Sequence, residues 1–315
     1  MGEKEICVFS GLGHPALAEE ICKHLGIPLS PSVTRKFSND NIYVQLRDSV
    51  REKDIFIIQP LTVPVSDNLV ELLLLLDAAR SASAKRVTAV IPYYSYSRSD
   101  KKDEPRISIA AKLVADLIQT AGAERVLTMT MHSPQVHGFF QMPVDHLSAH
   151  PVLATFYRQK DLSNMVVVAP DMGHAKRAYS FARNLGLPVA AGTKKRLTDE
   201  TVQIDNIIGD VQGKRVILFD DEVATAGSAI EAVARLREMD VTEVSVCCTH
   251  GVLSGPAIER LKNTPEIHEI VTTNTVPIPE EKQIPGMHVL SVAPLFAEAI
   301  RRIHAGQSMT TLFEY

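Results

Sequence analysis

Short apolar runs alternate along the whole chain with longer stretches whose apolar residues recur at a helical period. Apolar runs of strand length predict strands at residues 5–10, 42–45, 54–59, 86–92, 125–130, 165–169, 189–192, 215–220, 243–249 and 269–272. The longer stretches predict helices at residues 14–25, 67–82, 107–121, 175–185, 228–239 and 255–263. Regular alternation of strand and helix is typical of parallel sheets joined by right-handed crossovers, so we expect an α/β fold.

The helix expected at residues 67–82 differs from the others in its apolar content. It contains a run of five leucines, which suits a helix that is buried on most sides. Ser66 and Asp67 are available as residues that cap its start.

Two parts of the chain resemble each other. VFSGLGHPALAEEICKHLGIPL from Val8 parallels VVAPDMGHAKRAYSFARNLGLPVA from Val167, and VREKDIFIIQP from Val50 parallels VQGKRVILFDD from Val211. We therefore expect two similar doubly wound parallel-sheet domains, residues 1–147 and 148–305, joined near residues 145–152. The tail at 306–315 is expected to pack on the first domain. Ligands of such sheets bind at the carboxyl ends of the strands.

One strand end carries a recognisable binding chemistry. In RVILFDDEVATAGSAIEAVA, an apolar strand ends at Asp220 and Asp221, and a helix follows a short turn. Two adjacent carboxylates can accept hydrogen bonds from vicinal sugar hydroxyls. The turn and helix start offer backbone N–H groups and hydroxyls to a phosphate, and Gly227 permits close approach. The alternative is an acidic strand end followed by a Ser-capped helix; the combined spacing favours a socket for a 5-phosphorylated ribose, formed by Asp220, Asp221, Ala224, Thr225, Ala226, Gly227 and Ser228.

Composition narrows the class of protein. The chain has 315 residues, 45% apolar and 22% charged, with a net charge of −4, and these values are ordinary for a soluble globular protein. It has no basic footprint for nucleic acid, no apolar run long enough to span a bilayer and no signal-peptide pattern. Its cysteines (Cys7, Cys22, Cys247 and Cys248) lack metal-ligand spacing and are expected to be small buried residues in a reducing compartment. We expect a cytoplasmic protein that binds neither nucleic acid nor membranes.

The T-A-G-S turn after the paired aspartates resembles the signature of the type I phosphoribosyltransferase fold. From Val8 to Phe313 the chain resembles the phosphoribosyl-pyrophosphate synthetases, on segments that include TMTMHSPQVHGFFQMPVDHL, PYYSYSRSDKKDEPRIS and THGVLSGPAIERL. The resemblance implies two domains of that fold. It also implies a ribose-phosphate diphosphokinase that transfers the β,γ-diphosphoryl group of ATP to the C1 hydroxyl of ribose 5-phosphate. The family assembles as homo-oligomers, from dimers to hexamers, with shared sites.

The resemblance also implies roles for individual residues. His132 and Asp171 match magnesium-contacting positions, so Mg²⁺ is the expected cofactor. Lys194 and Arg196 match cations of a flexible catalytic loop, and His132 lies by the reacting group. The positions that match ATP-binding residues are Phe37, Asn39, Asn41, Arg98, Ser99, Asp100 and His132. The positions that match a regulatory phosphate or ADP site are Ser49, Arg51, Ser81, Arg106, Ser308 and Thr310.

Simpler interpretations exist for several of these residues. His132 on its own would be a polar loop residue, and Asp171 would serve as a cap for the helix expected at Ala175. The cationic run at Lys194 would be a solvated surface, and the Tyr-rich segment around Arg98 a surface patch or an interface.

Some positions depart from the family pattern: Asn41, Ser99, Thr130, Ala224, Ser228 and His174. The departures leave two further hypotheses open. One is a phosphoribosyltransferase that uses the same socket, although such enzymes need only one such domain. The other is a non-catalytic or weakly active homologue that regulates a true synthetase. Retention of His132, Asp171 and the paired aspartates favours the enzyme.

Overall fold

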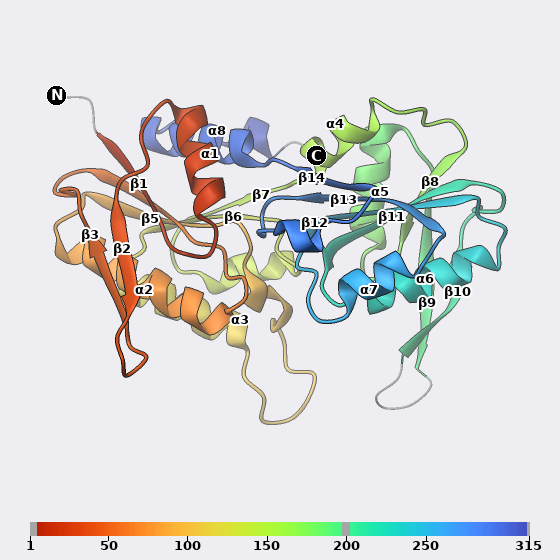
Figure 1. Ribbon diagram of the computed structural model, residues 1–315, viewed down its shortest axis with the longest axis horizontal. Coiled ribbons are helices and arrows are strands. Elements are labelled where there is room, and N and C mark those ends of the chain that lie inside the picture. Colours follow the sequence, from red (N-terminus) through yellow and green to blue (C-terminus); the bar gives the residue numbers. More distant parts are fainter. Residues whose placement is uncertain (1–4, 197–201, 314–315) are drawn as a thin grey trace. The chain divides into compact units, whose positions relative to one another are not determined.

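The computed structural model describes residues 5–196 and 202–313 and divides the chain into two compact units (Figure 1). The first unit comprises Met1–Ser148, Thr275–Pro277 and Val292–Glu314; the second comprises Ala149–Asn274 and Ile278–Ser291. The last helix, α8 (Ala293–Ala305), packs against α1 (Pro15–Leu25) of the first unit. The chain therefore crosses back after the second sheet, whereas the sequence prediction ended the second domain at residue 305.

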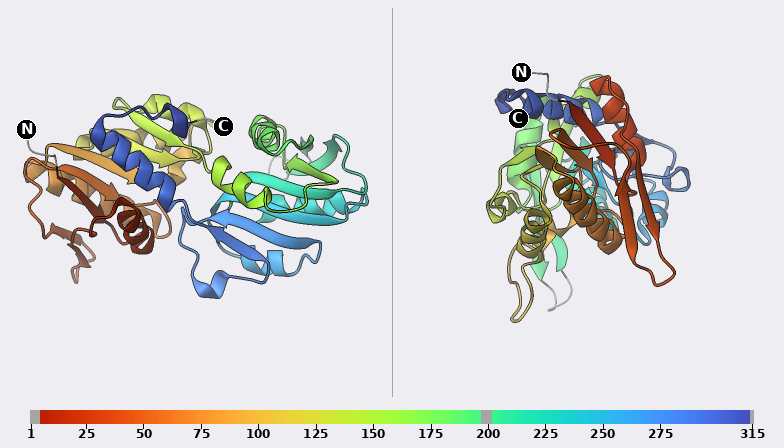
Figure 2. Two further views of the ribbon diagram at one scale, coloured as in Figure 1. Left: turned by 90° about the horizontal axis from the view of Figure 1, so that it is seen from above. Right: turned by 90° about the vertical axis from the view of Figure 1, so that its left-hand side faces the viewer.

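The first unit is built on a five-stranded parallel sheet in the order β1-β4-β5-β6-β7. Helices α1 and α8 lie on one face of this sheet, and α2 and α3 on the other (Figures 1 and 2). The elements not yet given are β1 (Ile6–Ser10), β4 (Asp54–Ile58), β5 (Arg86–Ile91), β6 (Arg125–Met129), β7 (Val144–Leu147), α2 (Val65–Ser81) and α3 (Ala110–Ala121).

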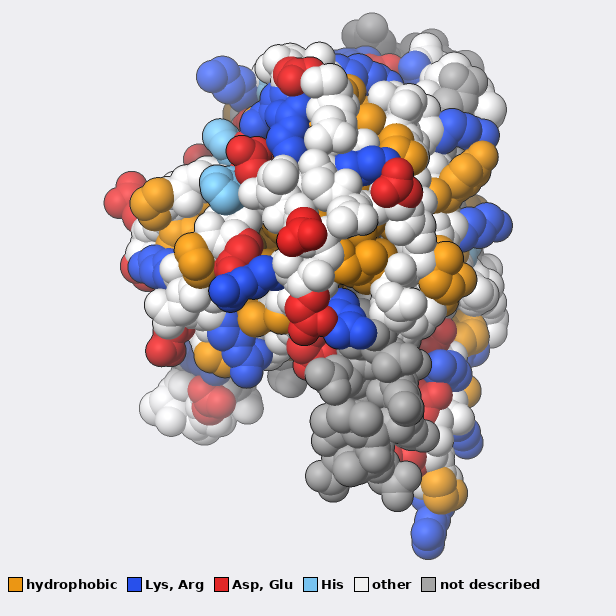
Figure 3. All heavy atoms as spheres, turned by 90° about the vertical axis from the view of Figure 1, so that its right-hand side faces the viewer, with side chains coloured by type: hydrophobic (Ala, Val, Ile, Leu, Met, Phe, Trp, Pro, Cys, Tyr) orange, Lys and Arg blue, Asp and Glu red, His pale blue; other side chains and the backbone are white. Residues whose placement is uncertain are grey.

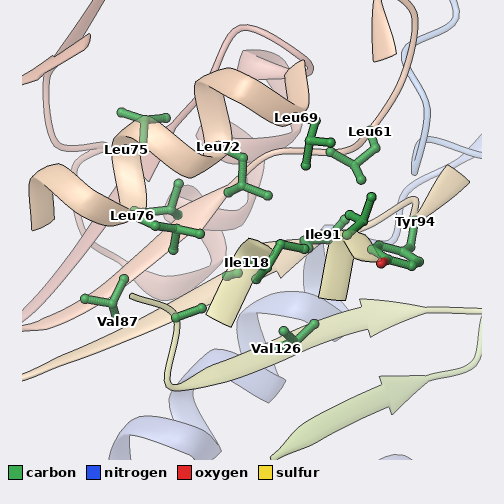
Figure 4. Packing of buried hydrophobic residues seen from close by; sticks show 14 of the residues in the cluster. Leu61, Leu69, Leu72, Leu75, Leu76, Val87, Ile91, Tyr94, Ile118 and Val126 are labelled. Carbon is green, nitrogen blue, oxygen red and sulfur yellow. The ribbon is translucent and has the colours of Figure 1, made fainter. Parts of the chain in front are cut away.

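Helix α2 supplies much of this unit's core, as its leucine content predicts. Leu72, Leu75 and Leu76 are fully buried, and Figure 4 shows them beside Val87 and Ile91 of β5. The predicted caps are wrong: the helix starts at Val65 after Pro64, with no side-chain capping bond. Asp67 lies inside the first turn, where a carboxylate interacts favourably with the helix dipole, and it pairs with Lys36 at 2.8 Å.

A two-stranded antiparallel sheet, β2 (Ser32–Lys36) and β3 (Ile42–Leu46), is also part of the first unit. Neither strand is buried, and β2 was not predicted because its polar residues give no apolar run.

The second unit is built on a seven-stranded sheet in the order β10-β9-β8-β11-β12-β13-β14, parallel except for the β9–β10 pair. Helix α4 packs against α5, and α6 packs against α7. The buried residues of α6 and α7 belong to the same apolar cluster as those of the strands they cover. The strands are β8 (Met165–Ala169), β9 (Val189–Arg196), β10 (Val202–Ile208), β11 (Arg215–Val223), β12 (Glu243–Gly251), β13 (Ile267–Thr273) and β14 (Met287–Leu290). The helices are α4 (His150–Tyr157), α5 (Ala175–Leu185), α6 (Gly227–Arg237) and α7 (Ala257–Lys262).

The predicted parallel α/β fold is confirmed, with element ends that differ by a few residues. Besides β2, the apolar runs and helical periods of the sequence did not locate β7, β10, β14, α4 and α8. Short 3-10 helices complete the chain: η1 (Ser95–Arg98), η2 (Pro134–Phe139), η3 (Glu280–Lys282) and η4 (Thr310–Leu312).

The expectations from composition can be compared with the described residues. All four cysteines are buried and not in disulfides. Within residues 5–196 and 202–313, no helix has the length and apolarity to cross a membrane. On the face shown in Figure 3, Lys and Arg side chains are intermixed with Asp and Glu. Among the coloured side chains of that view, no extended patch of one charge is seen.

Candidate active site

The site in the second unit is built at the carboxyl end of β11. The strand continues through Val223, three residues beyond its predicted end, so Asp220 and Asp221 belong to the strand. Ala226 adopts a left-handed conformation with φ 60°, and α6 begins directly after it at Gly227. A left-handed residue next to a helix start turns successive N–H groups toward one side, the arrangement that backbone nests use to bind anions.

Three carboxylates gather around one imidazole beside this turn. His174 Nδ1 lies 2.9 Å from Asp171 Oδ1, and its Nε2 lies 3.2 Å from Asp221 Oδ1 and 3.6 Å from Asp220 Oδ1. On the other side of Asp221, Arg177 Nη1 lies 3.1 Å from Oδ2. Asp221 is nearly buried, with 3% of its side chain exposed. A buried carboxylate requires such partners, since its charge is otherwise very costly to desolvate.

The cluster changes the titration of its members. Burial alone would lower the pKa of His174, but hydrogen bonds to Asp171 and Asp221 and the charges of Asp220 and Asp221 raise that pKa to about 10. Burial and the adjacent Asp221 raise the pKa of Asp220 well above its usual range. The described residues of the second unit thus place three carboxyl groups, one imidazole and one guanidinium in a single ionic cluster.

The sequence reasoning found the three carboxylates but gave His174 no role. The signal was present, since His174 replaces a glycine that is usual in the resembling family. Asp171 also makes a helix-start contact: its Oδ1 accepts a hydrogen bond from His174 N–H at 3.2 Å, although the N-cap residue of α5 is His174 itself. The interpretation of Asp171 as the cap of α5 is therefore wrong, since its carboxylate bonds the N–H of the cap residue and not one inside the helix.

The residues predicted to bind ATP lie in the first unit, on two segments. Phe37, Asn39 and Asn41 occupy the turn between β2 and β3, where the Phe37 ring is 47% exposed. Its ring meets Tyr43 edge-on at 5.7 Å, and the guanidinium of Arg35 lies over both rings. An exposed ring already held by neighbours is a preformed surface for stacking.

The second segment brings Arg98 close to His132. Arg98 ends η1, with Ser99 and Asp100 after it, and the hydroxyl of the preceding Ser97 accepts a hydrogen bond from His132 N–H at 3.1 Å. Thr130, at the end of β6, has φ 41°, a strained value for a β-branched residue. Such strain is common at functional sites and here redirects the chain just before His132.

Lys194 and Arg196 were expected in a loop after the strand at residues 189–192. The structure corrects the strand end: β9 continues through Arg196 and pairs antiparallel with β10, with Lys194 opposite Ile204 and Arg196 opposite Val202. The side chains of both cations lie outside the described residues.

The predicted regulatory residues are all in the first unit. Ser49 and Arg51 line a pocket of about 370 Å³ that also includes Ala78 and Ala82, on either side of Ser81. Ser308 Oγ lies 3.0 Å from Thr310 Oγ1 in the C-terminal tail. Arg106 is exposed with φ 68°. Of the predicted regulatory residues, Ser49 and Arg51 therefore line the same pocket, and Ser308 and Thr310 are hydrogen-bonded to each other.

Comparison with known proteins agrees with this architecture. A family model described as the N-terminal domain of ribose phosphate pyrophosphokinase matches residues 6–122, and one described as the phosphoribosyl synthetase-associated domain matches residues 198–314. The ribose-phosphate pyrophosphokinase of Deinococcus radiodurans is 55% identical over 313 residues, covering 98% of each chain. That of Clostridium acetobutylicum is 49% identical over 313 residues, covering 99% of this chain and 98% of the relative.

A solved structure supports the same assignment. The crystal structure of phosphoribosylpyrophosphate synthetase from Mycobacterium smegmatis superposes with a TM-score of 0.91 at 40% identity, covering 96% of this chain and all of that one. Similarity of this extent along nearly the whole chain goes well beyond a shared fold. The chain belongs to the ribose-phosphate pyrophosphokinase family.

Proposed function

We propose that this protein transfers the β,γ-diphosphoryl group of ATP to the C1 hydroxyl of ribose 5-phosphate, giving 5-phosphoribosyl 1-diphosphate and AMP. The observation that carries the proposal is the Asp220-Asp221 pair, followed within one turn by the start of α6. The C1 oxygen forms a bond to the β-phosphorus, and the bond from that phosphorus to the oxygen bridging the α-phosphate breaks. AMP leaves with the bridging oxygen, and the proton of the C1 hydroxyl is released to solvent.

Ribose 5-phosphate would be held by the second unit. Asp220 and Asp221 accept hydrogen bonds from the two vicinal ring hydroxyls, and His174 and Arg177 hold Asp221 in place. The 5-phosphate lies against the N–H groups and hydroxyls of the turn, formed by Ala224, Thr225, Ala226, Gly227 and Ser228.

The donor set also fits magnesium, a hard cation that prefers carboxylate oxygens and keeps several waters. Three carboxyl groups converge beside the turn, and burial together with the adjacent Asp221 raises the pKa of Asp220. We assign Asp171 and His132 as the residues that would hold the ion. When bound, it would supply neutralisation of the charge on the diphosphoryl oxygens.

The remaining machinery would bind and stabilise the donor. Phe37 stacks on adenine, Asn39 and Asn41 bind its edge, and Arg98 binds phosphate oxygens with Ser99 and Asp100 beside it. Lys194 and Arg196 stabilise the charge that develops during transfer. Replacing either cation by Ala should lower turnover about 100-fold, as is typical of charge-stabilising groups.

One experiment tests the proposal against its alternatives. The purified protein is incubated with ATP, ribose 5-phosphate and magnesium while phosphorus resonances are followed. AMP together with a new C1 diphosphate supports the proposal. If no product forms in this assay but the protein stimulates a partner synthetase on mixing, it is instead a regulatory homologue.

We extend the proposal to the protein's assembly and regulation. A cytoplasmic homo-oligomer with shared sites is expected. The pocket at Ser49 and Arg51 would bind regulatory phosphate or ADP. If phosphate and ADP leave activity unchanged at constant free magnesium, the regulatory assignment is wrong.

A further inference from the structure

The turn that we assign to the substrate phosphate is held from behind by a separate segment, residues 253–260. Leu253 N–H donates to Val223 O at 3.0 Å, and Ser254 N–H donates to Ala224 O at 2.9 Å. The next carbonyl oxygen, that of Thr225, accepts from Arg260 Nη1 at 3.0 Å. Three consecutive carbonyl groups of the turn therefore face the same segment.

This pattern determines where the N–H groups of the turn point. In a trans peptide, C=O and N–H are directed to opposite sides of the planar unit. Because the carbonyls of residues 223–225 face the segment at 253–260, the N–H groups of Ala224, Thr225 and Ala226 face away from it. These N–H groups form a row that leads directly into the first turn of α6 at Gly227.

Arg260 also brings a charge to this place. A Cβ added to Gly227 would lie 3.4 Å from Arg260 Nη1, so the guanidinium lies directly against the start of α6. Two neighbouring arginines are neutralised, since Arg235 pairs with Glu238, and Arg237 with Glu266 at 3.1 Å. Among the described residues, Arg260 pairs with no carboxylate, so its charge is available to an anion on the other side of the turn.

We propose that Arg260 is a positioning residue for the phosphate group of the substrate. It holds the Thr225 carbonyl so that the row of N–H groups faces the phosphate, and it adds positive charge behind that row without touching the substrate. This inference rests on the proposed function. It concerns only the sugar-phosphate end of the reaction, so loss of Arg260 should weaken ribose 5-phosphate binding and leave ATP binding unchanged.

The test compares Arg260→Met, Arg260→Lys and a matched control, Arg237→Met, in steady-state kinetics. Arg260→Met should raise KM for ribose 5-phosphate about tenfold, the effect of losing one charge-assisted hydrogen bond. Its KM for ATP should not change, and kcat should fall less than twofold. Arg260→Lys keeps the charge and should recover part of the loss, whereas Arg237→Met should behave as wild type.

A binding measurement separates positioning from a general structural effect. Titration with inorganic phosphate, without ATP, is followed through the amide resonances of selectively labelled Thr and Gly residues. In the wild type, phosphate should shift the amide resonances of Thr225 and Gly227. In Arg260→Met, the same shifts should require about tenfold more phosphate, while the melting temperature stays unchanged. The inference is overturned if Arg260→Met leaves KM for ribose 5-phosphate unchanged, or if KM for ATP rises equally. If wild type itself forms no diphosphate product, the proposed function fails instead, while the phosphate titration still reports on Arg260.

Discussion

The two halves of the chain place the same Gly-His pair at the start of the same helix and use the histidine differently. In the first unit, His14 caps α1 by accepting a hydrogen bond from Leu17 N–H at 3.3 Å. In the second unit, His174 starts α5, but its ring contacts Asp171 and the paired aspartates. A residue that stabilises a helix in one half has become part of an ionic cluster in the other.

The neighbouring strand explains why. At the end of β4, Gln59 fills the loop: its Oε1 accepts from Gly13 N–H at 2.9 Å, and its Nε2 donates to Glu71 at 2.6 Å. Glu71 also accepts from Leu12 N–H at 2.9 Å. The positions of β11 that correspond to Gln59 and Pro60 are Asp220 and Asp221, and Asp221 is paired with His174 and Arg177. The first unit thus fills this loop with hydrogen bonds from Gln59 and Glu71, whereas the second unit places an ionic cluster there.

The largest expected effect is on catalysis. It comes from replacing the two aspartates of β11, which distinguish that strand end from the end of β4. Asp220→Asn with Asp221→Asn should lower kcat/KM for ribose 5-phosphate about 1,000-fold, because two charge-assisted hydrogen bonds of about 2 kcal/mol each are lost. Gln59→Met, at the corresponding place in the first unit, should lower the free energy of unfolding and leave KM for ribose 5-phosphate unchanged. Equal kinetic losses in both variants would contradict the division of roles.

The second effect concerns pH and the second unit alone. The pKa of His174 is raised to about 10, so its stabilising contribution is complete below about pH 6.5 and is lost as pH rises through 10. The raised pKa of Asp220 acts in the same direction, since its contribution is also lost with rising pH. The free energy of unfolding should fall by about 4 kcal/mol from pH 6.5 to 10. Denaturant titrations of His174→Gly at several pH values should show a clearly smaller fall in the free energy of unfolding. If that free energy falls with pH as steeply as in the wild type, the role of His174 is refuted.

A third effect separates the filled loop from the open one. A Cβ on Gly11 would lie 2.4 Å from Gln59 Oε1, and Gln59 is fully buried and hydrogen-bonded, so it has no room to move. Gly11→Ala should therefore destabilise the protein by about 2 kcal/mol. A Cβ on Gly173 would lie 3.0 Å from Asp171 Oδ1, at the end of a partly exposed side chain. Gly173→Ala should cost less than about 1 kcal/mol in urea unfolding. Equal losses in the two variants would show that the loops are alike, and a larger loss for Gly173→Ala would contradict the comparison.

The smallest effect tests the capping role of His14. His14→Ala removes the acceptor for Leu17 N–H and should lower the free energy of unfolding by about 1 kcal/mol. His14→Asn supplies another capping acceptor and should recover most of the loss. Thermal unfolding at fixed pH measures both, and identical losses in the two variants would exclude capping as the cause.

Local patterns predicted much of the fold and part of the site. Runs of apolar residues located most strands, and Gly26 and Gly186 stand at the helix ends where the structure has left-handed residues. The turn after Asp221 was predicted because its residue types and spacing are contiguous. Strands such as β2 and β14 were missed because they are short and partly exposed, and so lack an apolar run.

By itself the sequence determined the alternation of strands and helices, the duplication, and the residues of the turn that we assign to the phosphate, since each depends on neighbours along the chain. Only the tertiary structure decided which distant side chains hold these turns in place. Arg260 reaches the Thr225 carbonyl and Gln59 reaches Gly13 across 35 and 46 positions of sequence. Such contacts depend on how each helix packs on its sheet, and no local periodicity encodes that. The charge of Asp220 and Asp221 was legible from the sequence, whereas their neutralisation by His174 and Arg177 required the fold.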